Sequence, residues 1–172
     1  IIDYDLRNKM GEAAIKMASL LKYESAGTVE FLFDEKTKEF WFLEVNTRLQ
    51  VEHPVTEEVT GIDLVREQLK IANGDPLSIS QDDVEIIGSS IEVRLYSEDP
   101  GNDFLPVTGK LIAFDPCEEP LVRWDIGVES GSEITPNFDP MLAKIISYGE
   151  YIIEAANKLA LVEPSNFNFN IE

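Results

Sequence analysis

The chain has 172 residues, 44% of them apolar, which is enough for one ordinary domain or two small ones with a packed core. Its 33 acidic and 14 basic residues give a formal charge of −19, which disfavours nucleic acid and anionic membrane surfaces as partners. The single cysteine, Cys117, excludes an internal disulfide, and no apolar run approaches the roughly 20 residues that a membrane-spanning helix needs.

The first third of the chain predicts one helix and two strands. Apolar residues recur at helical spacing from Leu6 to Leu21. Because the chain opens on Ile1 and this pattern starts almost at once, we expect it to begin partway into a longer fold. Residues 29–33 and 40–45 then alternate as two strands joined by a polar segment, which predicts a hairpin.

The rest of the chain predicts a second helix and then mostly strands. The helix is expected to follow Asp63 and to stop at Gly74, and Ser80 with Asp83 predicts a capped turn. Further strands are expected at 91–95, 109–114, 121–126 and 143–148. We expect an α+β fold with a first domain over 1–80 and a mostly antiparallel β domain over 86–172.

The predicted hairpin brings acidic and amide groups together. A register with Leu32 opposite Phe42 places Glu30 opposite Glu44, and like charges in that position repel unless something neutralises them. Asn46 lies two residues beyond Glu44 and shares its face. Such an oxygen-rich patch suits Mg²⁺ or Mn²⁺. The alternative from spacing alone is a solvated acidic sheet face.

The loop after the second strand carries groups that recognise an anion. Arg48 offers a planar fork for a carboxylate, bicarbonate or phosphate, and Gln50 can donate to the same anion. Glu52 is near enough to act as a general base. The alternative is a surface ion pair between Arg48 and Glu52. His53 precedes a proline and is interpreted as structural.

Arg94 is a second arginine of interest, because it falls on the polar face of the strand predicted at 91–95. By itself it is interpreted as a solvated or ion-paired side chain. The sequence contains no P-loop, no dinucleotide-binding fingerprint, no nucleophile elbow and no cysteine–histidine metal motif.

Taken together, these residues resemble biotin carboxylase, the ATP-grasp component of biotin-dependent carboxylases. The resemblance runs from about residue 5 to residue 150 and rests on the strings AGTVEF at 26–31, FLEVNTRLQVEHPVTE at 42–57, EVRLYSEDP at 92–100 and DPMLAK at 139–144. It implies the C-terminal part of an ATP-grasp fold followed by the family's C-terminal domain. The implied activity uses ATP and bicarbonate to carboxylate biotin through carboxyphosphate.

The resemblance also implies residue roles. Glu30, Glu44 and Asn46 would hold the magnesium or manganese ions that bridge the nucleotide phosphates. Bicarbonate would be bound by Arg48, Gln50 and the backbone of Val51. Glu52 would be the activating base, and Arg94 would stabilise the biotin enolate.

The resemblance also implies partners for the full-length protein and indicates that this chain is inactive by itself. Biotin would be presented by a separate carrier domain, a carboxyltransferase would choose the acceptor, and the full-length protein would be a homo-oligomer of an acyl-CoA or urea carboxylase. Cytoplasm is expected, or the mitochondrial matrix in a eukaryote. Most of the family's ATP site lies upstream of the residues present here, so we expect no turnover from this chain alone. The tail at 151–172 departs from the family pattern.

Two other functions remain open from the sequence. The chain could be a non-catalytic assembly module that keeps the scaffold, or part of another ATP-grasp ligase. The Gln50–His53 run and the Arg94 block argue against the second.

Overall fold

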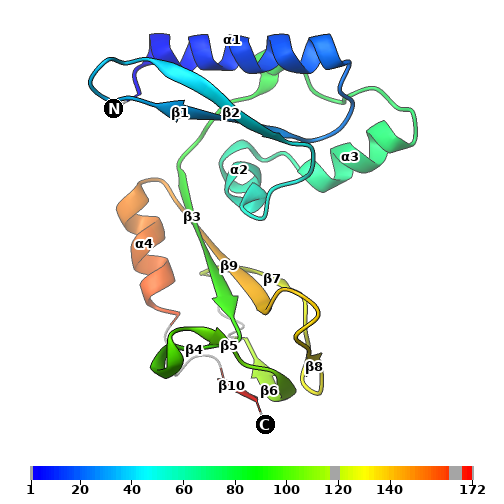
Figure 1. Ribbon diagram of the computed structural model, residues 1–172, viewed down its shortest axis with the longest axis vertical. Helices are drawn as coiled ribbons and strands as arrows, with labels where there is room; N and C mark the ends of the chain where they lie inside the picture. The colour runs from blue at the N-terminus through cyan, green and yellow to red at the C-terminus, as the bar shows by residue number, and fades with distance from the viewer. Residues whose placement is uncertain (1, 117–120, 163–167, 172) are drawn as a thin grey trace. The chain divides into compact units, whose positions relative to one another are not determined.

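The computed structural model describes residues 2–116, 121–162 and 168–171, so Cys117 lies outside the described residues. The chain forms two compact units, one from Ile1–His53 with Asp63–Asp83 and one from Pro54–Ile62 with Val84–Glu172. Figure 1 shows helices and short antiparallel sheets, and the predicted α+β class is confirmed. Within the described residues, no helix has both the length and the apolar character required to cross a membrane.

The first unit opens with helix α1, Tyr4–Leu21, as the apolar spacing predicts. Asp3 caps it: its Oδ1 accepts a hydrogen bond from the backbone N–H of Leu6 at 2.9 Å. The helix ends at Lys22, which takes the left-handed conformation with φ of 48°.

Strands β1, Thr28–Phe33, and β2, Phe40–Asn46, pair antiparallel as the predicted hairpin. Their outer halves pack through the Phe31 and Phe40 rings, which meet edge to face with centroids 5.2 Å apart. Asp34 stabilises the turn by accepting hydrogen bonds from the next backbone N–H groups.

The register of this hairpin agrees with the prediction at one end and not at the other. Glu30 lies opposite Glu44, as expected. Leu32, however, pairs with Trp41 rather than Phe42, because a β-bulge leaves Leu43 without a partner position in β1. A regular alternation was assumed in the prediction, and one extra residue in β2 overturns it.

Helix α3, Leu64–Ala72, completes the first unit together with a short 3₁₀ turn, η1, at Gln81–Asp83. Asp63 caps α3 by accepting from the backbone N–H of Arg66 at 2.8 Å. The helix stops before Gly74, which has a φ of +88°. Ser80 Oγ donates to Asp83 at 2.6 Å, so the predicted capped turn is confirmed.

The second unit is built on a three-stranded antiparallel sheet in the order β3-β9-β7. Its strands are β3, Ser89–Tyr96, β9, Met141–Gly149, and β7, Arg123–Ile126. Helix α4, Ile152–Ala160, packs against β9, where Ser147 Oγ donates to Ala155 O at 2.8 Å in a buried contact. This helix occupies part of the tail at 151–172.

A second sheet has the order β10-β6-β8, from Asn168–Ile171, Gly109–Asp115 and Glu133–Ile134. Two smaller strands, β4 at Glu98–Asp99 and β5 at Leu105–Pro106, pair around the 3₁₀ turn η2 at Pro100–Asn102. The core cluster joins the two larger sheets. Its buried members are Leu111, Phe114 and Ala143, with Leu95, Trp124, Val128 and Ile171 packed against them.

Helix α2, His53–Thr60, was not predicted from the sequence. It starts where the first unit ends, and Pro54–Ile62 belong to the second unit. The backbone N–H of Ile87 donates to Val59 O at 2.8 Å, and Pro54 is fully buried. The chain therefore passes from the first unit to the second and back within ten residues.

Candidate functional site

The two facing carboxylates of the hairpin are joined by an amide. Asn46 Nδ2 donates to Glu30 Oε1 at 2.7 Å and to Glu44 Oε1 at 3.2 Å. The pairing of β1 with β2 creates this geometry, because Glu30 and Glu44 are opposite each other and Asn46 is one step further along the same face. The three predicted ligands therefore converge on one patch.

This patch has the donor chemistry of a hard divalent cation site. It offers four carboxylate oxygens and an amide, and such groups suit Mg²⁺ more than a soft metal. Across the described part of the chain, no group of three or more His, Cys, Asp or Glu residues is arranged to hold a metal ion. Two carboxylates and one amide fit an ion that is also held by substrate phosphates, which is the usual way magnesium is bound.

The loop after β2 places its polar side chains close together. The Arg48 guanidinium is exposed, and its Nη1 donates to Leu49 O at 3.2 Å and to Gln50 Oε1 at 3.5 Å. Glu52 is also exposed. His53 closes the loop, since its Nδ1 lies 2.8 Å from Gln50 O and its backbone N–H donates to the same carbonyl. A cation, an amide and a carboxylate are thus available to solvent or ligand within one short segment.

Arg94 lies in the second unit, on strand β3, and its side chain is exposed as the polar-face prediction requires. Its Nη1 donates to Tyr96 Oη at 3.5 Å, and Lys144 is its cross-strand neighbour on β9. Lys144 also lies opposite Asp125 on β7 and contacts its carboxylate, so positive and negative side chains alternate across this face of the sheet.

One charged cluster of the second unit was missed in the sequence. Arg123 Nη1 contacts Glu57 Oε2 at 2.9 Å and Glu58 Oε1 at 3.2 Å. Its Nε and Nη2 bind Asp125 Oδ1 and Oδ2 at 2.8 and 3.0 Å, and Lys144 Nζ lies 3.4 Å from Asp125 Oδ2. The signal was the Arg123–Asp125 spacing, which puts both side chains on one face of a strand.

The charges of this cluster stabilise one another. Hydrogen bonds to Asp125, Glu57 and Glu58 outweigh burial and raise the pKa of the Arg123 guanidinium. Burial alone would raise the pKa of Asp125, but the hydrogen bonds and charge of Arg123, with Lys144, bring it below its usual value. The pKa shifts of Arg123 and Asp125 therefore both favour the charged forms of this pair.

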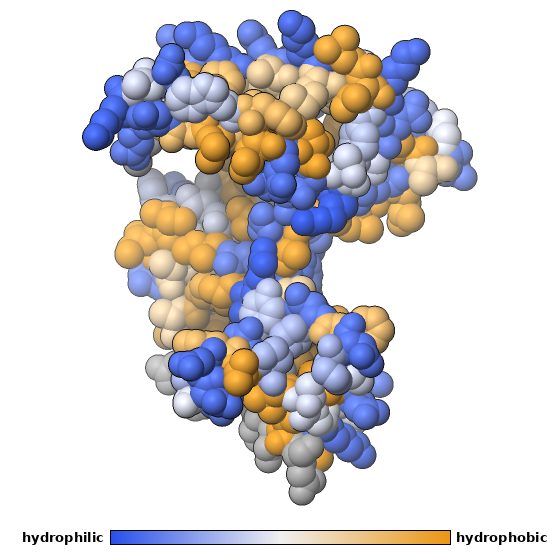
Figure 2. All heavy atoms as spheres, in the orientation of Figure 1, coloured by the Kyte–Doolittle hydropathy of each residue, from blue (hydrophilic) through white to orange (hydrophobic). Residues whose placement is uncertain are grey.

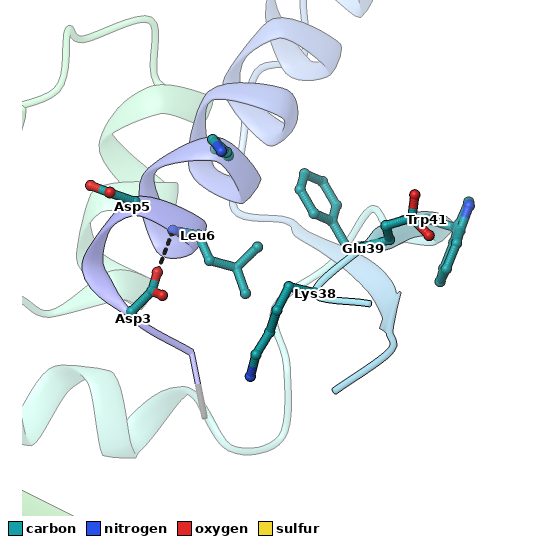
Figure 3. Close-up of a pocket in the computed structure, with 8 residues that line it drawn as sticks. Asp3, Asp5, Leu6, Lys38, Glu39 and Trp41 are labelled. Atoms are coloured by element: carbon teal, nitrogen blue, oxygen red, sulfur yellow. Dashed lines mark hydrogen bonds between the residues drawn. The ribbon is translucent and has the colours of Figure 1, made fainter. Parts of the chain in front are cut away.

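A pocket of the first unit lies apart from the predicted residues (Figure 3). It has a volume of about 520 Å³ and is formed by the start of α1 and the outer end of the hairpin, with Asp3, Leu6, Lys38, Glu39 and Trp41 among its walls. None of Glu30, Glu44 or Asn46 lines it.

Two family models match the chain in succession. Residues 1–80 match "Carbamoyl-phosphate synthase L chain, ATP binding domain", and residues 92–162 match "Biotin carboxylase C-terminal domain". The chain belongs to the biotin carboxylase family. The predicted fold, the C-terminal part of an ATP-grasp domain followed by the family's C-terminal domain, is confirmed.

Individual proteins that are similar to this chain belong to the same family. The chain is 50% identical over 161 residues to the human mitochondrial propionyl-CoA carboxylase alpha chain, and 49% identical over 158 residues to biotin carboxylase 2 of Bacillus subtilis. Each match covers 92% of this chain but only 22% and 35% of the relatives. The chain thus spans about a fifth to a third of the length of these proteins.

Solved structures give the same family. The biotin carboxylase subunit of a pyruvate carboxylase superposes with a TM-score of 0.89 at 37% identity, covering 99% of this chain and 38% of that one. The biotin carboxylase domain dimer of Hydrogenobacter thermophilus 2-oxoglutarate carboxylase, in complex with MgADP, ADP and bicarbonate, has a TM-score of 0.89 at 36% identity. It is matched over 99% of this chain and 37% of its own length.

Proposed function

We propose that this chain carries the metal-binding and bicarbonate-binding residues of a biotin carboxylase. The full-length protein uses MgATP and bicarbonate to carboxylate biotin on a carrier domain. The observation that carries the proposal is the convergence of Glu30, Glu44 and Asn46 on one face of the hairpin. The likeness to a biotin carboxylase domain solved with MgADP and bicarbonate supports it.

In this proposal the hairpin holds the divalent cation. The carboxylate oxygens of Glu30 and Glu44 would bind Mg²⁺ or Mn²⁺, together with Asn46 Oδ1 once the amide that now donates to both carboxylates turns over, and the ion would offset the negative charge of the nucleotide phosphates. The ion also relieves the repulsion between the two facing carboxylates.

The loop binds and activates bicarbonate. The forked Arg48 guanidinium pairs with two of the three bicarbonate oxygens, and Gln50 with the backbone N–H of Val51 completes the recognition. Glu52 takes the proton of bicarbonate, so that an oxygen attacks the γ-phosphorus of ATP while the bond to ADP breaks. Carboxyphosphate and ADP are the products. Arg48 is catalytic as well as binding, because its charge also offsets the growing charge on the attacking oxygen.

Arg94 serves the second half of the reaction. Carboxyphosphate splits to carbon dioxide and phosphate, the released phosphate takes the proton from the ureido nitrogen of biotin, and that nitrogen then bonds to carbon dioxide. The guanidinium of Arg94 offsets the negative charge that develops on the ureido oxygen. Its exposure on β3, beside Lys144, supports this role.

The remaining assignments extend the same proposal. Residues 1–80 form the end of the ATP-grasp domain and 86–172 the C-terminal domain, which the positions of the two family matches support. The partners are a biotin carboxyl carrier domain and a carboxyltransferase, in a homo-oligomeric acyl-CoA or urea carboxylase. The site of action is the cytoplasm, or the mitochondrial matrix in a eukaryote; the human relative is named as a mitochondrial protein.

The test measures ATP cleavage by the full-length protein with and without bicarbonate, and carboxylation of free biotin. We expect Glu52→Gln to lower bicarbonate-dependent cleavage about 100-fold or more, since general-base catalysis contributes that much. Arg94→Ala should lower biotin carboxylation by about 100-fold. The 172-residue chain alone should show no turnover.

Matched controls are Glu35→Gln in the hairpin turn and Arg66→Ala on α3, both exposed and outside the proposed site. Unchanged turnover in Glu52→Gln and Arg94→Ala would exclude the assignment. A full-length protein that cleaves no ATP would instead be an assembly module. Cleavage that depends on a different acceptor would identify another ATP-grasp ligase.

A further inference from the structure

Asn46 joins the two carboxylates of the hairpin from the end of the ladder. It is the last residue of β2 and pairs with Thr28, the first residue of β1. Its amide donates to Glu30 and Glu44, which face each other two residues further into the hairpin. The end of a strand opens more readily than its middle, because it has a neighbouring pair on one side only. The position of Asn46 therefore depends on what contacts it beyond the ladder.

Gly27 lies against this end of the hairpin. A Cβ atom placed on Gly27 would be 3.3 Å from Asn46 O and 3.0 Å from Cε1 of the Tyr23 ring, both closer than ordinary van der Waals contact. Gly27 does not have a positive φ, so its backbone conformation is open to residues that carry a side chain. Glycine is therefore needed here for space and not for its conformational freedom.

The Tyr23 ring is fixed at both ends. The backbone N–H of Tyr23 donates to Ala18 O at 3.0 Å, in the cap that ends α1. At the other end of the side chain, Tyr23 Oη donates to Ala26 O at 2.7 Å. A methyl group on Gly27 cannot displace this ring without disturbing the hydrogen bond to Ala26, so part of the displacement falls on Asn46.

A small displacement of Asn46 matters for a metal ion. Relief of a contact of 3.3 Å requires a shift of a few tenths of an ångström. Mg²⁺ holds its ligands at about 2.0–2.1 Å in near-ideal octahedral geometry, so it tolerates such a shift poorly. The residues that orient metal ligands generally contribute about 10- to 100-fold to metal affinity.

We propose that Gly27 is a positioning residue for the metal site: because it has no side chain, the turn after α1 packs directly on Asn46 and holds its amide at Glu30 and Glu44. The inference rests on the proposed function of these three residues as metal ligands. Gly27 itself touches no metal in this role, and its effect passes through Asn46. All the residues involved belong to the first unit.

The binding test uses the full-length protein with ADP and Mn²⁺, and measures unbound Mn²⁺ by electron paramagnetic resonance. Gly27→Ala should raise the Kd for Mn²⁺ about 10-fold. Gly11→Ala is the matched control, because Gly11 lies on α1 in the same unit and a Cβ atom there meets no atom within 4 Å. It should keep the wild-type Kd. The melting temperature of each variant in EDTA shows whether its fold is intact before metal is added.

Two double variants test the route of the effect. Asn46→Ala should itself weaken Mn²⁺ binding, and adding Gly27→Ala should weaken it no further, because both changes act on the same ligand. Tyr23→Phe in the Gly27→Ala background releases the ring from Ala26. The new methyl group can then displace the ring instead of Asn46, so part of the Mn²⁺ affinity should return.

Each alternative result has a definite meaning. A wild-type Kd in Gly27→Ala would overturn the positioning role, and so would full additivity with Asn46→Ala or no recovery with Tyr23→Phe. A melting temperature in EDTA that falls in Gly27→Ala while the Kd stays unchanged would assign Gly27 a purely structural role. If the wild-type protein binds no Mn²⁺, the proposed function fails at the metal site and the positioning role fails with it.

Discussion

Glu30 and Glu44 show how the residues of a metal site can destabilise the folded protein when the metal is not bound. The two carboxylates face each other across the hairpin, and Asn46 offsets only part of their repulsion with one amide nitrogen. A divalent cation would turn this repulsion into attraction. The same pair of residues is therefore expected to have opposite effects on stability with and without metal.

This expectation can be tested with Glu44→Gln in the full-length protein. Without metal, loss of one of two facing charges should raise the free energy of unfolding by up to about 1 kcal/mol, or about 2–4 °C in Tm. With Mg²⁺, the variant should lack the stabilisation that the wild type gains. Thermal unfolding in EDTA and in Mg²⁺ gives both results.

Glu39→Gln is the control, because Glu39 is exposed and lies at the other end of β2, before Phe40. It should leave both melting temperatures close to the wild type. A lower Tm of Glu44→Gln in EDTA would show that the two charges do not repel each other in the folded protein.

At the level of elements, helix α3 is hydrogen-bonded to the segment that follows it. Glu67 is buried, and its carboxylate accepts from Lys70 Nζ at 2.7 Å, from Ser78 Oγ at 2.7 Å and from the Ser78 backbone N–H at 3.2 Å. The hydrogen bonds from Lys70 and then from Ser78 lower the pKa of Glu67 to about 2.

This low pKa predicts a pH dependence with a definite sign. The unfolded Glu67 titrates near its ordinary value of 4.5, so the unfolded state binds more protons between pH 4.5 and 2. The stabilisation is complete above about pH 4.5 and is lost as the pH falls through the folded pKa near 2. Glu67→Gln should show a shallower loss of stability over this range in urea unfolding, whereas Glu12→Gln, an exposed helical glutamate, should follow the wild type. Equal slopes in all three proteins would contradict the prediction.

The sequence predicted elements with a clear period and missed those that depend on distant contacts. Helices α1 and α3, the hairpin, and strands β3, β6, β7 and β9 follow from apolar spacing and caps. Helix α2 has no such signal, and its acidic side chains pair with Arg123, more than 60 residues away in sequence. The bulge at Leu43 was also missed. The pattern of side chains along a strand does not show where one extra residue is inserted relative to the partner strand.

The same limit applies to the site. The convergence of Glu30, Glu44 and Asn46 could be predicted because a hairpin register fixes it locally. The Arg123 cluster could not, because it joins α2, β7 and β9, and sequence alone does not set which distant strand meets a short helix.

At the level of the whole molecule, the two units differ in how much they bury. Leu6 is the only buried apolar side chain described in the first unit, whereas the second has a core around Leu111, Phe114 and Ala143. Apolar side chains are visible on the surface in Figure 2, and the hairpin alone leaves Trp41 and Phe42 about half exposed. In the isolated chain we expect the second unit to be the more stable one.

The chain's two tryptophans allow each unit to be followed separately, since Trp41 lies in the first and Trp124 packs on the core of the second. Leu111→Ala should lower the free energy of unfolding reported by Trp124, in a Trp41→Phe background, by about 2–5 kcal/mol. The transition reported by Trp41, in a Trp124→Phe background, should move much less.

Ile112→Ala is the matched control, because Ile112 is the next residue on β6 and is 44% exposed. It should shift the Trp124 transition by less than about 1 kcal/mol. Equal shifts of both tryptophan signals in Leu111→Ala would show that the two units unfold as one.

The bulge at Leu43 has a consequence for how this hairpin can vary. Phe42 pairs with Phe31 and Glu44 with Glu30, so two residues that a regular strand would point the same way point to opposite sides. Leu43 is one extra residue in the alternation of β2. The aromatic residues before it and the polar residues after it therefore face opposite sides from those that a regular strand would give. Deletion of Leu43 would therefore remove the bulge and leave a regular ladder in which Phe42 still faces Phe31 and Glu44 still faces Glu30, because consecutive residues of a strand point to opposite sides.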